Sequence, residues 1–180
     1  MPTRYNDPGH AHYLTFSCHN RLKLFKELSI CELFISNLER IRCQTQTLLW
    51  AYVIMPDHVH LLIDLQDKLS VSKYLQSLKK TVSYYAIRWI QENKPRWIPY
   101  IQTVQRGKSV FRFWLPGGGY DRNIYGDQTL LKTMNYIHNN PVRAGLVEKP
   151  TDWKWSSAKF WEFEEPDPIR LDIPPWWSQT

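Results

Sequence analysis

The residues from His58 to Leu65 alternate between polar and apolar types. Because successive side chains on a strand point to opposite faces, this pattern predicts a half-buried β-strand. The face that would pack into a core consists of Val59, Leu61, Ile63 and Leu65. The opposite face consists of His58, His60, Leu62 and Asp64. A rigid strand would hold two imidazoles side by side, so His58 and His60 are candidate metal ligands. The same spacing also occurs by chance or as a structural pair.

Length and composition indicate a globular protein with a polyanionic partner. A chain of 180 residues with 43% hydrophobic residues and 7 glycines is expected to form one domain, residues 1–180, around a full core. The 23 Lys and Arg residues exceed the 17 Asp and Glu residues, which gives a net charge of +6. This excess is spread along the chain, and it makes nucleic acid or phosphate the first partner to test.

Cysteine usage and hydropathy indicate the cellular compartment in which the protein works. The three cysteines are odd in number and lack CxxC spacing, which favours reduced thiols over disulfides or a zinc knuckle. No apolar run approaches the ~20 residues of a membrane span, and residues 1–6 show no signal-peptide core. We therefore expect a soluble, cytoplasmic protein that has no membrane partner.

Periodicity predicts the order of the elements. Strands are expected over 12–19, 48–55, 58–65 and 110–114, and helices over 28–45, 70–93 and 127–139. Ser70 is expected to cap the second helix, Asp127 to cap the third, and Pro141 to end it. The order β-α-β-β-α-β followed by a helix predicts an α+β fold, with a ferredoxin-like or RRM-like antiparallel sheet and two helices on one face. Residues 150–180 form a tail rich in tryptophan and proline, expected to wrap the domain.

The predicted third helix carries a second candidate site. Tyr136 and Asn140 lie four residues apart, so they share one face of the helix. A tyrosine hydroxyl can act as a nucleophile, and an amide oxygen can bind a hard cation. Taken alone, the pair is better read as structural, with Tyr136 a half-buried interface residue and Asn140 a C-terminal cap. His138 would point away from Tyr136, and Asp64 would lie about 13 Å along the strand from His60.

Three separated motifs resemble a known family. They are the residues 53–63 around His58-Val59-His60, the residues 136–147 that begin with Tyr136, and Asp152-Trp153-Lys154-Trp155-Ser156-Ser157. In this order they resemble the single-tyrosine HUH transposases, and most of all the branch associated with repetitive extragenic palindromes (REP). HUH denotes histidine, a bulky hydrophobic residue and histidine. The resemblance covers about residues 10–160.

The resemblance implies the HUH endonuclease fold, with a C-terminal helix that carries the tyrosine, and it implies a mechanism. His58, His60 and Asn140 would hold a divalent cation, Mg²⁺ or Mn²⁺, with zinc left open. Tyr136 would attack a DNA phosphate and form a 5′-phosphotyrosine. The implied partner is single-stranded DNA that contains a hairpin. Candidate DNA contacts are Lys73, Lys79, Lys80, Arg88, Arg106, Lys108, Arg112 and Arg122, although each one taken singly is more readily read as an ordinary solvated charge.

Other interpretations remain open at the level of sequence. A catalytically idle module of the same fold would bind single-stranded nucleic acid without cleaving it. A zinc hydrolase would use the two histidines and not Tyr136. The family includes monomers and homodimers, so the oligomeric state is open, as are the DNA sequence recognised and whether the protein mobilises an element or serves its host.

Overall fold

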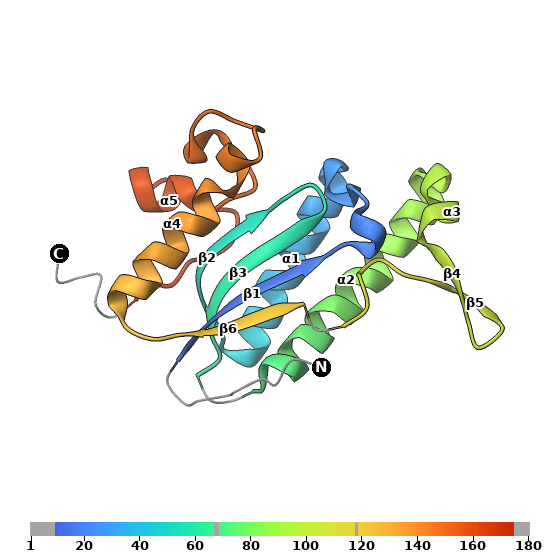
Figure 1. The fold of residues 1–180 in the computed structure, drawn as a ribbon, viewed down its shortest axis with the longest axis horizontal. Coiled ribbons are helices and arrows are strands. Elements are labelled where there is room, and N and C mark those ends of the chain that lie inside the picture. The colour runs from blue at the N-terminus through green and yellow to red at the C-terminus, as the bar shows by residue number, and fades with distance from the viewer. Residues whose placement is uncertain (1–9, 67–68, 118, 175–180) are drawn as a thin grey trace.

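The computed structural model describes residues 10–66, 69–117 and 119–174. Its centre is an antiparallel sheet of four strands in the order β2-β3-β1-β6 (Figure 1). The strands are β1 (Ala11–Ser17), β2 (Leu48–Ile54), β3 (His58–Asp64) and β6 (Tyr120–Ile124). β3 lies between β1 and β2 and pairs antiparallel with both, which is the ferredoxin-like arrangement that the sequence predicts.

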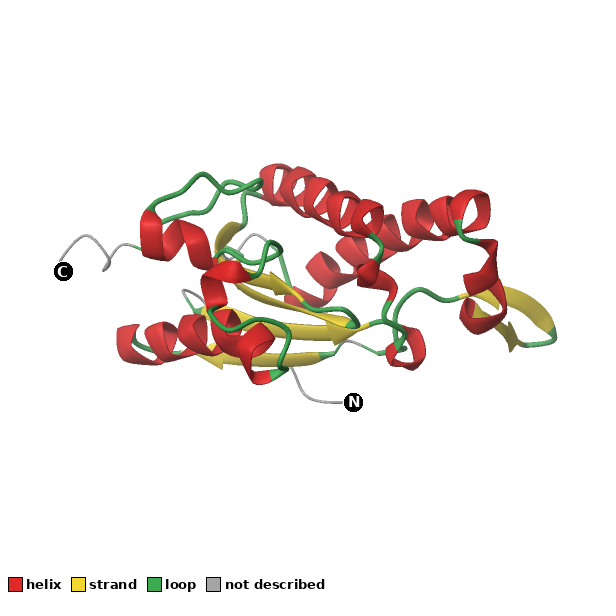
Figure 2. Ribbon diagram, turned by 90° about the horizontal axis from the view of Figure 1, so that it is seen from above, coloured by secondary structure: helices red, strands yellow, loops and turns green. Residues whose placement is uncertain are grey.

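Helices cover both faces of this sheet (Figure 2). Helices α1 (Leu28–Thr45) and α2 (Val71–Asn93) pack against each other and against one face, as expected. Helix α4 (Asp127–Arg143) packs on the other face, chiefly against β2. The Ser70 hydroxyl caps α2 by accepting a hydrogen bond from the Lys73 backbone N–H at 3.3 Å.

The predicted alternation on β3 is confirmed by two separate cores. Val59, Leu61 and Ile63 lie in the core under α1 and α2. Leu62 lies in the smaller core under α4. The histidines therefore face the layer that contains α4, because they share their face of β3 with Leu62.

The fourth strand of the sheet is not the one predicted. Val110 and Phe111 belong to a separate ribbon of two strands, β4 (Gln102–Gln105) and β5 (Lys108–Phe111), and Trp114 meets the end of β1 through an isolated bridge to Cys18. The fourth strand, β6, was missed because its sequence, Tyr-Asp-Arg-Asn-Ile, is mostly polar. It is an edge strand in which Ile124 is the one buried residue, so pairing with β1 rather than an apolar pattern defines it.

Helix α4 begins and ends differently from the prediction. Gly126 occupies the N-cap position, Asp127 is the first helical residue, and the helix continues past Pro141 to Arg143. Proline removes the N–H that would bond the Ile137 carbonyl. The Asn140 side-chain amide donates to that carbonyl at 3.3 Å, and this bond helps the last turn to tolerate the proline.

The C-terminal segment wraps the domain, as expected, and it covers the β2 edge. The backbone N–H of Ile54 donates to the Trp155 carbonyl, and the Ser157 N–H donates to the Tyr52 carbonyl. The indole N–H groups of Trp153 and Trp161 donate to carbonyls of the same strand. Trp176 and Trp177 lie outside the described residues.

The remaining short elements are η1 (His19–Arg21), η2 (Leu24–Lys26), η3 (Pro95–Trp97), α3 (Ile98–Ile101), η4 (Pro150–Asp152) and α5 (Ala158–Phe163). Within the described ranges, no helix combines the length and apolar character needed to cross a bilayer.

Candidate active site

The two histidines of β3 converge on one point. Their Nε2 atoms lie 3.0 Å apart, and their rings are nearly perpendicular. Two nitrogen ligands about 2.1 Å from one cation and at right angles to each other would be separated by about 3.0 Å. The 3.0 Å separation lies within hydrogen-bond distance, and it also suits a cation that both nitrogens share.

Each imidazole is held through its other nitrogen. His58 Nδ1 lies 2.7 Å from a carboxylate oxygen of Asp57. His60 Nδ1 lies 2.7 Å from the Tyr13 hydroxyl and 2.8 Å from the Thr15 hydroxyl. A metal-binding histidine is commonly oriented in this way, with its second nitrogen bonded to an oxygen. Sequence reasoning missed Tyr13 and Thr15, which pair with Leu62 and His60 across the sheet.

His60 is in the form that binds metals. It is buried, with an exposed fraction of 4%, and burial together with the neighbouring His58 lowers its pKa from 6.5 to about 3. The imidazole is therefore neutral at physiological pH, and its Nε2 atom can act as an electron-pair donor.

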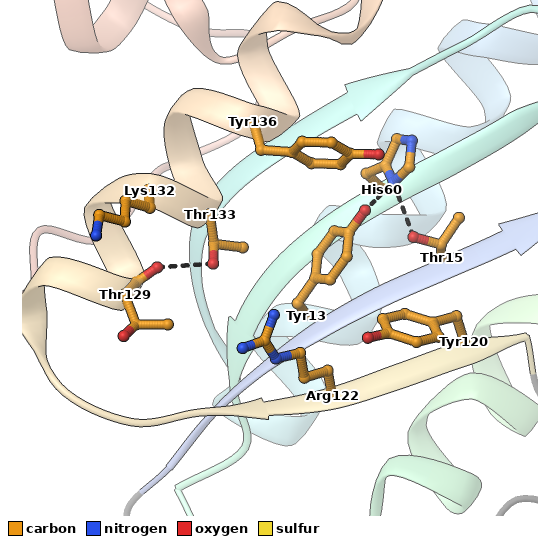
Figure 3. Close-up of a pocket in the computed structure, with 9 residues that line it drawn as sticks. All are labelled: Tyr13, Thr15, His60, Tyr120, Arg122, Thr129, Lys132, Thr133 and Tyr136. Carbon is orange, nitrogen blue, oxygen red and sulfur yellow. Dashed lines mark hydrogen bonds between the residues drawn. The ribbon is translucent and has the colours of Figure 1, made fainter.

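Tyr136 lies against this pair. It projects from α4 toward His60, as Figure 3 shows, and the two ring centroids are 6.2 Å apart. Its ring also packs edge-on against Tyr13 at 6.1 Å, and the Arg143 guanidinium lies 5.1 Å from its centroid. With 41% of its surface exposed, Tyr136 can be reached from solvent. The fold brings together the tyrosine and the histidine that the sequence places on separate elements.

Asn140 lies one turn beyond Tyr136 on α4. Its amide nitrogen donates to the Tyr136 carbonyl at 2.7 Å and to the Ile137 carbonyl. These bonds use the NH₂ group and not the oxygen, which is the atom that would bind a cation. The assignment of Asn140 as third ligand stays a prediction. His138, as expected, does not face the site: it is buried, and its Nε2 atom lies 2.8 Å from the Ser157 hydroxyl.

A cavity of about 690 Å³ opens between the sheet and α4 beside these residues (Figure 3). It is lined by Tyr13, Thr15, His60, Tyr120, Arg122, Thr129, Lys132, Thr133 and Tyr136. Arg122 and Lys132 give it positive charge, and the three tyrosines give it aromatic surface. Lys132 was not among the candidates, although it precedes Tyr136 by four residues and so shares its helix face. Phosphates and unpaired bases suit such a lining.

The other predicted DNA contacts lie elsewhere. Lys73, Lys79, Lys80 and Arg88 belong to α2, on the opposite side of the sheet from the cavity. Lys79 donates to the Gly117 carbonyl at 2.9 Å, and Arg88 pairs with Glu92 at 3.1 Å. Arg112 follows β5 and donates to the Gln105 side chain. Arg106 and Lys108 lie on the ribbon of β4 and β5, outside the cavity lining. Of these candidate cations, Arg122 is the one that lines the cavity, and DNA binding by all of them stays a prediction.

Comparison with known families gives this geometry a context. Residues 9–140 match the model of the IS200-like transposases. The chain belongs to the IS200-like transposase family. The match contains the histidine pair, Tyr136 and Asn140, the residues on which the sequence prediction rests.

Two individual proteins are similar to the chain. A Haemophilus influenzae protein assigned to the REP-associated tyrosine transposases is 30% identical over 111 residues, or 59% of this chain and 56% of that protein. The chain therefore aligns with little more than half of that relative's length. A solved REP-associated tyrosine transposase, bound to a REP hairpin, superposes with a TM-score of 0.68 and 17% identity over 97% of this chain and 93% of its own. This likeness shows a shared fold.

Proposed function

We propose that the protein cleaves and rejoins single-stranded DNA at the edge of a hairpin through a covalent bond to Tyr136. The phenol oxygen of Tyr136 attacks the scissile phosphorus and gives up its proton, while the bond to the 3′ oxygen breaks and that oxygen takes up a proton. The products are a 5′-phosphotyrosine and a free 3′-hydroxyl. The reverse step with a second 3′-hydroxyl joins strands and needs no nucleotide cofactor.

Each group of residues in the site has its own role in the proposed reaction. His58 and His60, with Asn140 as the proposed third ligand, would hold Mg²⁺ or Mn²⁺, which polarises the phosphate when it is bound. Arg122 and Lys132 would bind neighbouring phosphates along the cavity, and Tyr120 would offer a surface for a base. Tyr13, Thr15 and Asp57 hold the two imidazoles in place.

One observation carries the proposal: the ring of Tyr136 packs against the ring of His60 at the edge of a cavity that Arg122 and Lys132 also line. The Nε2 atoms of His58 and His60 lie 3.0 Å apart beside it. A nucleophile and a cation site side by side, open to solvent, suit phosphoryl transfer to tyrosine. The hairpin carried by the solved relative of the same fold supports a hairpin substrate.

Replacing Tyr136 with phenylalanine tests the assignment of the nucleophile. The experiment incubates the protein and Mn²⁺ with hairpins taken from palindromic repeats beside its gene, and detects covalent attachment by denaturing electrophoresis. Wild type is expected to attach to the DNA. Tyr136→Phe is expected to lose attachment completely while its affinity for the same hairpin changes by less than about 2-fold, because the phenylalanine keeps the ring contacts.

Two results would contradict this proposal. Cleavage that survives in Tyr136→Phe would remove Tyr136 as the nucleophile, which is also the behaviour expected of a zinc hydrolase. Hairpin binding by wild type without attachment, in Mg²⁺, Mn²⁺ or Zn²⁺, would favour an idle binding module. Tyr125→Phe, on an exposed tyrosine outside the cavity lining, is the matched control and should attach like wild type.

A further inference from the structure

The ribbon of β4 and β5 projects from the body of the molecule beyond α3 (Figure 1). Both strands are short, and the turn at Arg106 and Gly107 joins them with positive φ angles of 51° and 74°. All ten of its residues (102–111) are exposed or half-exposed, so neither face is buried in a core. An isolated ribbon of two strands is marginally stable in water, so contacts within the ribbon alone do not explain why the chain forms one here.

The ribbon and its base carry one sign of charge. Residues 93–120 contain five cations, Lys94, Arg96, Arg106, Lys108 and Arg112, and no Asp or Glu. Within the described part of the chain, Arg106 and Lys108 at the tip form no ion pair, whereas Lys94 and Arg96 at the base contact Glu27. The two tip cations are therefore available to an anionic partner.

The rest of the ribbon offers hydrogen-bonding groups and apolar surface. Thr103 and Gln105 present polar side chains on one face, Gln102 donates to the Ser109 hydroxyl at 2.7 Å on the other face, and Val104 is 74% exposed. A hollow of about 330 Å³ beside its base is lined by Arg96, Trp97 and Tyr100. Positive charge combined with exposed amides and hydroxyls is typical of surfaces that contact nucleic acid.

We propose that this ribbon is a clamp for duplex DNA that enters the major groove of the hairpin stem, while Tyr136 acts on the adjoining single strand. The width of the major groove admits a ribbon of two strands. Arg106 and Lys108 bind phosphates on the groove walls, and the side chains of Thr103 and Gln105, which share one face of the ribbon, face the base edges. This inference rests on the proposed function, because it assigns the stem of the same hairpin to a second surface.

The charge-removing double variant Arg106→Gln/Lys108→Gln tests the clamp. Both side chains are exposed at a turn, so the fold should tolerate the change. The probes are a fluorescein-labelled DNA hairpin of arbitrary sequence, with a stem of about one helical turn, and an unstructured oligothymidylate. Affinities are measured by fluorescence anisotropy over a series of salt concentrations. The matched control is Arg40→Gln/Arg170→Gln, which removes two exposed cations elsewhere.

The double variant Arg106→Gln/Lys108→Gln, called the tip variant here, is expected to bind the hairpin about 10-fold more weakly at low salt. Its slope of log affinity against log salt should be smaller by about 2, one for each lost phosphate contact. Its affinity for oligothymidylate, and its covalent attachment to a cleavable single strand, should match wild type. The control should bind both probes like wild type.

An equal loss of affinity for both probes, or an equal loss in the control, would overturn the clamp. So would unchanged hairpin binding in the tip variant, or failure of wild type to prefer the hairpin over oligothymidylate. Failure of the proposed cleavage appears separately, as missing attachment in wild type. A wild type that attaches while its tip variant binds stems normally would therefore refute the clamp alone.

Discussion

At the scale of single residues, His60 depends on two hydroxyl groups from the neighbouring strand. Tyr13 and Thr15 both lie within 2.8 Å of its Nδ1 atom, and Tyr13 also packs against the Tyr136 ring. Burial raises the pKa of Tyr13 to about 12, so its hydroxyl stays protonated at physiological pH. Tyr13 is therefore placed to link the proposed cation site to the proposed nucleophile.

Removing the Tyr13 hydroxyl should slow attachment without weakening DNA binding. We expect Tyr13→Phe to lower the rate of covalent attachment about 10-fold to 100-fold and to raise the Mn²⁺ concentration that gives half the maximal rate, because His60 loses one of its two anchors. Time courses over a Mn²⁺ series, together with anisotropy, measure both effects. Tyr85→Phe, an exposed tyrosine on α2, should have no effect. A loss of hairpin affinity as large as the loss of rate would show that Tyr13 contacts DNA instead.

At the scale of elements, the start of β6 depends on a glycine. Gly119 precedes Tyr120, which pairs with Thr15 on β1. A Cβ atom at residue 119 would lie 2.1 Å from the Thr15 carbonyl oxygen, and the residue has a positive φ of 74°. Close pairing of β6 with β1 thus needs glycine here, and β6 places Tyr120 and Arg122 at the cavity.

Gly119→Ala should destabilise the protein more than Gly117→Ala does. Both glycines have positive φ, which costs a side chain about 1 to 2 kcal/mol, but a Cβ at residue 117 would meet open space. The clash at residue 119 adds to this cost, so we expect a further loss of about 1 kcal/mol or more in the free energy of unfolding. Urea denaturation measures both variants. Equal losses would show that β6 shifts without strain.

At the scale of the whole molecule, the C-terminal segment is fastened to β2 and to the last turn of α1. The Tyr52 hydroxyl donates to Asp167 at 2.8 Å, and Asp172 accepts from Arg42 and from the Leu49 N–H. An uncovered edge strand would expose unpaired backbone groups, so this cover also protects the sheet. Burial raises the pKa of Asp167 from 3.8 to about 6 despite the bonds it accepts.

This raised pKa predicts a dependence of stability on pH. The folded state holds the Asp167 proton more tightly than the unfolded chain does, so the contribution of this group is fully present below about pH 4 and is lost as pH rises through about 6. Asp167→Asn stays neutral and can still accept the Tyr52 bond. We expect it to unfold at higher urea than wild type above pH 7, with a smaller advantage at pH 5. Glu148→Gln, at an exposed carboxylate, should show no such change in stability between the two pH values. An equal gain in stability for Asp167→Asn at pH 5 and above pH 7 would show that the raised pKa of Asp167 is not the cause.

Local pattern determined much of the fold. The bounds of α1 follow from helical spacing, the Ser70 cap from its side chain, and the two faces of β3 from strict alternation. The same alternation put His58 and His60 on one face, and helical spacing put Tyr136 and Asn140 on another. These features depend on residues within a few positions of each other, so a sequence read along the chain contains them.

Tertiary structure decided how those pieces meet. β6 has no apolar pattern and exists because β1 offers it hydrogen bonds, while Val110 and Phe111, in the segment where the pattern predicted the fourth strand, belong to a separate ribbon. Tyr13 and Thr15 reach His60 through strand register, and α2 carries its cations away from the cavity because the sheet lies between them. Contacts between residues far apart in the chain depend on packing and register, which no local pattern encodes. The sequence by itself could therefore name the histidines and the tyrosine, but the packing of α4 on the sheet set Tyr136 beside His60.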